Sequence, residues 1–112
     1  MANKYRNEVE ITLGGKKYTL RASWETIVGI ETTLNTSILA LIARGSLTFK
    51  EAATVILLGL HGADDKSLTF EEIGKAVFED GMSRIGRPVI EFLSIALDGA
   101  KLGKQEPETA KS

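Results

Sequence analysis

Two short segments of alternating apolar and polar residues flank a pair of glycines near the N-terminus, and this pattern constrains the fold most strongly. The alternation covers residues 8–13 and 17–22 and has the two-residue period of a half-buried β-strand. Gly14 and Gly15 can adopt the two positive φ angles that a type I′ turn requires. The sequence therefore predicts an antiparallel β-hairpin over residues 8–22.

The two-residue turn also predicts the register of this hairpin. When Leu13 faces Lys16, apolar side chains gather on one face of the ribbon. The other facing pairs on it are Ile11 with Tyr18 and Val9 with Leu20. Because an isolated two-stranded hairpin is marginally stable in water, other elements must cover its apolar face.

Residues that are typical of the starts and ends of helices occur throughout the rest of the chain. The clearest starts are two capping boxes, Thr48-Phe49-Lys50-Glu51 and Thr69-Phe70-Glu71-Glu72, in which the hydroxyl and the last carboxylate each satisfy an unpaired backbone N–H. Ser23 and either Thr36 or Ser37 are suitable N-caps for two earlier helices. The predicted ends of the first four helices are Asn35, Gly45, about Leu60 and Gly81, and a fifth helix runs from near Ser83 to about Leu102.

The apolar positions predict which faces of these helices are buried. Residues 49–60 are apolar nearly all round, which is typical of a buried central helix. Pro88 is tolerated if it lies in the first turn of the last helix. The apolar positions are Trp24, Ile27, Val28 and Leu34 in the first helix, and Ile73, Val77 and Phe78 in the fourth.

The predicted class is α+β, mostly helical, with an N-terminal β-hairpin packed on a bundle of four to five short helices. A chain of 112 residues with 43% hydrophobic residues is expected to form one core. We predict a single globular domain over residues 1–102, with the hairpin in 8–22 and the helices in 23–102. Residues 103–112 are polar and are expected to form a flexible tail.

The inventory of reactive side chains argues against catalysis and against a metal or cofactor site. The chain has no cysteine and one histidine, His61, which is expected to cap the end of the central helix. Asp64 and Asp65 lack the alternation of ligands that a calcium loop needs. The pI near 5.8 does not favour nucleic-acid binding, and no apolar segment is long enough to span a membrane. We expect a cytoplasmic, non-enzymatic protein that binds other proteins.

Two residues depart from the pattern of their helices and are candidates for partner binding. Glu31 falls within the predicted apolar arc of the first helix, so its carboxylate either accepts N–H bonds near Thr36 and Ser37 or contacts a partner. Ile95 is expected on the solvent side of the last helix, with Arg84 and Glu91. The other candidates are Ile90 and Leu97, which widen the apolar stripe of that helix at its other edge.

Several stretches of the chain, taken together, match a known family pattern. They are Ala2-Asn3-Lys4-Tyr5-Arg6 with Glu8-Val9, Tyr18-Thr19-Leu20-Arg21, Ile30-Glu31, Ser37-Ile38-Leu39-Ala40-Leu41, and Thr69-Phe70-Glu71-Glu72-Ile73 followed by Gly81. Over residues 2–102 the chain thus resembles the tail assembly chaperones of gene transfer agents and long-tailed phages. Asn7 and Asn35 stand where glycine is expected in that family.

The resemblance implies a non-enzymatic protein that acts during tail morphogenesis in the cytoplasm of a bacterial host, including hosts that carry a prophage. Its implied partners are the tape-measure protein and the tail tube protein. An alternative function with the same fold is a permanent structural component of the tail or of the head–tail joint. A small hydrolase or nucleotide-binding protein is disfavoured by the missing motifs. The sequence leaves open the client, the binding face and whether the chain forms a homo-oligomer.

Overall fold

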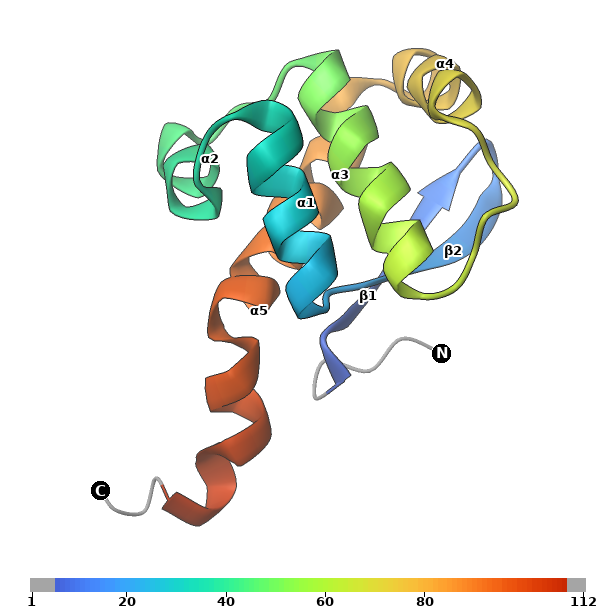
Figure 1. The fold of residues 1–112 in the computed structure, drawn as a ribbon. Coiled ribbons are helices and arrows are strands. Elements are labelled where there is room, and N and C mark those ends of the chain that lie inside the picture. The colour runs from blue at the N-terminus through green and yellow to red at the C-terminus, as the bar shows by residue number, and fades with distance from the viewer. Residues whose placement is uncertain (1–5, 109–112) are drawn as a thin grey trace.

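The computed structural model describes residues 6–108 and the side chains of residues 6–98. It confirms the α+β class, because a two-stranded N-terminal hairpin packs against a set of helices (Figure 1). The strands are β1 (Glu8–Leu13) and β2 (Lys16–Arg21). The helices are α1 (Trp24–Leu34), α2 (Ile38–Arg44), α3 (Phe49–Gly62), α4 (Phe70–Asp80) and α5 (Met82–Glu108).

The hairpin forms in the predicted register. Leu13 pairs with Lys16, and the turn residues Gly14 and Gly15 have φ angles of 59° and 81°, which glycine adopts without steric cost. Val9 and Leu20, which also face each other, are buried. The covered face of the ribbon contributes to the same hydrophobic core as the helices.

Helix α3 is the buried central helix that the sequence predicts. It contacts α1, α4, α5 and β2, and in Figure 1 it lies between α1 and the hairpin. Two glycines near its end allow a close approach to β2. A Cβ atom on Gly62 would lie 2.1 Å from the carbonyl oxygen of Arg21, a distance that non-bonded atoms cannot adopt.

The predicted helix caps are confirmed. Both capping boxes are closed, with the Thr48 and Thr69 hydroxyls accepting from the N–H groups of Glu51 and Glu72. Ser23 and Ser37 cap α1 and α2 in the same way. Each cap satisfies N–H groups that have no partner inside the helix.

The two asparagines that depart from the family pattern adopt left-handed backbone conformations. Asn7 has a φ angle of 62°, and Asn35, the C-cap of α1, has a φ angle of 53°. Glycine adopts such angles most easily, and asparagine tolerates them better than most other residues. The left-handed backbone therefore explains why glycine is expected at both positions and why asparagine can replace it.

The apolar face predicted for α1 is correct for Ile27 and Leu34, which pack against the core, and wrong for Trp24 and Val28. Trp24 is 77% exposed and Val28 is also exposed, whereas Thr26 and Ile30 are buried. Thr26 can be buried because its hydroxyl lies 3.0 Å from that of Ser23 and donates to the carbonyl of Arg21. A satisfied hydroxyl costs little inside a protein, so the helix turns Thr26 inward and Trp24 outward.

Helix α5 begins at Met82, close to the predicted start, but continues past Leu102 to Glu108. Residues 109–112 of the predicted tail lie outside the described residues. Pro88 is the seventh residue of the helix and not part of its first turn. It has no N–H to donate to the carbonyl of Arg84, so this turn lacks one helical hydrogen bond.

The expectation that Ile95 faces solvent is also wrong, since its side chain is 8% exposed and belongs to the core. Helix α5 packs against β1 as well as against α2, α3 and α4. A helix that is covered by neighbours on more than one side buries a wider arc than the single stripe that the sequence predicts.

Candidate protein-binding surface

Large apolar side chains remain exposed at several places on the described surface. Single exposed apolar residues are common, so a group of them on one surface is more informative. Three aromatic residues form such a group at the start of α3 and along α4. They are Phe49, Phe70 and Phe78.

The amphipathic pattern of α4 explains why two of these aromatic residues face outward. Ile73 and Val77 are fully buried and hold the helix against the core. Phe70, Gly74 and Phe78 follow one another at intervals of four residues and therefore share a different face. Phe70 is 43% exposed and Phe78 is 73% exposed. Together with Gly74 they line an open groove along α4.

Phe49 extends this aromatic surface from α4 to α3. Its ring centroid lies 5.9 Å from that of Phe78, and the ring planes are inclined by 59°, a tilted geometry that aromatic pairs prefer. Phe49 and Phe70 are the first residues after the capping threonines of their helices. The capping boxes therefore fix the backbone from which these two aromatic side chains project.

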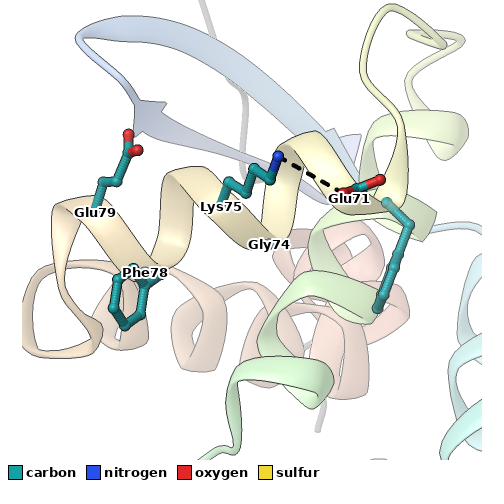
Figure 2. A pocket seen from close by; sticks show the side chains of 6 residues that line it. Glu71, Gly74, Lys75, Phe78 and Glu79 are labelled. Atoms are coloured by element: carbon teal, nitrogen blue, oxygen red, sulfur yellow. Dashed lines mark ion pairs between the residues drawn. The ribbon is translucent and has the colours of Figure 1, made fainter.

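Charged residues line one side of the groove. Figure 2 shows Lys75 and Glu79 projecting to a different side of α4 from Phe78. The Lys75 ammonium and the Glu71 carboxylate form an exposed ion pair at 3.6 Å. Glu79 has no ion-pair partner among the residues that the structure describes. Two carboxylates and one ammonium group leave the rim of the groove with a net negative charge.

The C-terminal end of α4 is tied to the hairpin. The Asp80 carboxylate accepts a hydrogen bond of 2.9 Å from the backbone N–H of Gly14, and the N–H of Gly81 donates to the carbonyl of Val77. At the other end, the Glu72 carboxylate closes the capping box. The aromatic face therefore lies on a helix with a capped start and with an end that is bonded to the hairpin.

The predicted partner-binding residues lie elsewhere, and none of them lines the α4 groove. Glu31 accepts a hydrogen bond of 3.0 Å from the N–H of Ile38, which confirms the expected contact with the start of the next helix. Ile90 is partly buried against the core, whereas Leu97 is 51% exposed. Ile95 has almost no exposed surface. A role of these four residues in partner binding stays a prediction.

Sequence reasoning missed the aromatic face because it assigned Phe78 to the same face as Ile73 and Val77. The available signal was the four-residue spacing of Phe70, Gly74 and Phe78. Ile73 and Val77 are likewise four residues apart and define a second stripe, so a helix with two apolar stripes buries only one of them here. The choice between the stripes depends on packing with α3 and α5.

The charged side chains that the structure describes were also considered as metal ligands. Within residues 6–98, no three His, Asp or Glu side chains are placed to hold a metal ion. His61 lies in the last turn of α3. Asp65 accepts bonds from the hydroxyl and N–H of Ser67, and these bonds lower the pKa of its carboxyl group despite partial burial.

Among the described residues, no single helix has both the length and the hydropathy that a membrane span requires. Helices α1 and α2 meet these requirements only as a pair, and the pair is bent by 66°.

The comparisons with known proteins give one match. Residues 6–99 match the model of a family described as phage tail tube protein, GTA-gp10. No curated protein and no solved structure matches the chain. The match spans most of the sequence, from two residues before β1 to the second half of α5. The chain is therefore a phage tail-related protein and belongs to the phage tail tube protein family of the GTA-gp10 type.

Proposed function

We propose that this protein is a non-enzymatic tail assembly chaperone that binds the tape-measure protein and the tail tube protein while a phage or gene-transfer-agent tail is built. The aromatic surface at α4 carries the proposal, because Phe49, Phe70 and Phe78 are exposed on two capped helices. Aromatic residues contribute strongly to protein interfaces. Such a surface can cover the apolar segments of a client protein.

The size of this surface suits a transient complex. One face of an 11-residue helix and one additional ring offer much less area than the more than about 2,000 Å² that obligate assemblies bury. A chaperone must release its client when tube subunits take over, and a small contact favours release.

A permanent structural component of the tail is the second candidate, and the description of the matching family favours it. The two functions differ in the fate of the protein. A structural subunit stays in the finished particle in many copies, whereas a chaperone leaves before completion.

The test combines co-purification with mass spectrometry. The full chain is co-expressed with the tape-measure protein of the same tail gene cluster, and finished particles are analysed separately. We expect co-purification with the client and absence from the particles. Phe78→Ser should reduce co-purification, while Trp24→Ser, which removes an equally exposed aromatic residue from α1, should not. Many copies in the particle would establish the structural alternative instead.

A further inference from the structure

Gly74 lies in the interior of α4, and neither the backbone nor internal packing requires glycine there. It is the fifth of the 11 helix residues and is not among the residues with positive φ. A Cβ atom at this position would meet no other atom within 4 Å. Glycine inside a helix is less favourable than alanine. Glycine at this position therefore adds no stability to the isolated protein.

The surroundings of Gly74 indicate what the absence of a side chain allows at this position. Phe70 lies one turn before it and Phe78 one turn after it, and both are exposed. Because Gly74 has no side chain, the groove along α4 has a notch at this residue, between the two aromatic side chains. Small residues at such a position allow the backbone of a second helix to approach closely, while the flanking aromatic rings contact its side chains.

The charges beside this notch favour some binding partners over others. Glu71, Lys75 and Glu79 line the same groove. Two facing copies of the chain would bring together four carboxylates and only two ammonium groups, and like charges in an interface are costly. A positively charged segment would instead pair with Glu79, which has no ion-pair partner among the described residues.

We propose that the notch at Gly74 binds a basic, amphipathic helical segment of the tape-measure protein, which crosses α4 with its backbone against Gly74. This inference rests on the proposed function and specifies its client segment. The apolar side chains of the segment contact Phe70 and Phe78 on either side of the crossing point. Its Lys or Arg side chains lie beside Glu79, which orients the segment and excludes acidic helices.

The first arm of the test fills the notch. Gly74→Leu places a side chain where the client backbone lies and should weaken retention of the tape-measure protein about tenfold or more. Gly74→Ala should have a smaller effect in the same direction. Both variants should melt at or above the wild-type temperature, because leucine and alanine are better helix formers than glycine. Loss of binding without loss of stability separates this role from a structural one.

The matched control is Gly29→Ala in the middle of α1. A Cβ atom there would meet Leu58 at 3.5 Å, an ordinary contact. This variant makes the same change as Gly74→Ala, but in a helix away from the groove. It should bind the client like the wild type.

The second arm reverses the charge of the rim. Glu79→Lys should weaken binding, and added salt should reduce the difference between this variant and the wild type. Glu25→Lys, at an exposed position in the first turn of α1, controls for the change in net charge. Overlapping synthetic peptides from the tape-measure protein are measured in parallel by fluorescence anisotropy. We expect the binding peptides to be basic and to gain helical circular dichroism on binding.

The outcomes separate the two proposals. If the wild type does not retain the intact tape-measure protein, the proposed function fails. If it retains the client and Gly74→Leu retains it equally, only the notch is overturned. Self-association of the wild type in sedimentation experiments that Gly74→Leu abolishes would assign the notch to a second copy and would also overturn the inference.

Discussion

At the scale of single residues, Ile95 and Leu97 have opposite environments although one residue separates them on α5. Ile95 is 8% exposed and Leu97 is 51% exposed. Ile95→Arg would bury a guanidinium without a partner, so it should lower the free energy of unfolding by several kcal/mol. Leu97→Arg, the matched control, should change it by less than about 0.5 kcal/mol. Urea unfolding followed by far-ultraviolet circular dichroism measures both, and equal stability of the two variants would contradict the burial of Ile95.

Residues with a local partner could be predicted from the sequence, and residues whose environment depends on distant segments could not. The contact of Glu31 with the start of α2 was predictable, because Glu31 and Ile38 are only seven positions apart. The burial of Thr26 was not, because its side chain lies against Gly62 of α3, far along the chain, as well as donating to the carbonyl of Arg21. Polar residues with such partners can replace apolar ones inside the core.

At the scale of elements, the start of α3 combines a capping box with an ion pair. Burial alone would raise the pKa of Glu51, but bonds from the Thr48 N–H and the Arg44 guanidinium outweigh burial. The charge of Arg44 and the Thr48 hydroxyl act in the same direction. The net effect lowers the pKa of Glu51 below its ordinary value near 4.5.

The lowered pKa predicts how this element responds to acid. A carboxyl group with a lower pKa in the folded state stabilises that state above its ordinary pKa, and the contribution is lost as the pH falls through the folded-state value. Glu51→Gln should therefore be less stable than the wild type at pH 7, and the difference should shrink below about pH 4.5. Thr48→Ala should cost about 1 kcal/mol at pH 7 and somewhat less in acid, because the Thr48 hydroxyl also contributes to the lowered pKa of Glu51. Denaturant unfolding at each pH measures both effects, and a pH-independent difference for Glu51→Gln would contradict the prediction.

The elements themselves were predicted more accurately than their orientation. Caps and glycine turns act within a few residues, so the hairpin and all five helices could be located from the sequence. The outward face of α1 and the wide buried arc of α5 follow from neighbours that are distant in the sequence. For the same reason the sequence directed attention to α5 and missed the aromatic face of α4.

At the scale of the whole molecule, the first and last elements of the chain hold each other in place. Strand β1 packs against α5, and β2 packs against α3. The hairpin thus completes a core to which the strands and all five helices contribute. Because no element has a separate core, we expect one cooperative unfolding transition.

Gly62 of α3 lies where this helix packs against β2 and α1. Replacing it therefore tests how closely these elements approach one another. A Cβ atom on Gly62 would lie 2.1 Å from the Arg21 carbonyl oxygen and 2.6 Å from the Thr26 hydroxyl oxygen. The Arg21 oxygen belongs to the backbone and cannot turn aside, so α3 would have to move away from β2.

Gly62→Ala should therefore destabilise the protein by about 1–3 kcal/mol, the cost of overpacking a dense core. In Gly86→Ala, the control in α5, the new Cβ atom would approach only the Met82 side chain, at 3.9 Å, and the gain in helix propensity should leave stability equal or higher. Thermal and urea unfolding of both variants provide the measurement. A wild-type melting temperature for Gly62→Ala would mean that the helix and the strand do not pack this closely in solution.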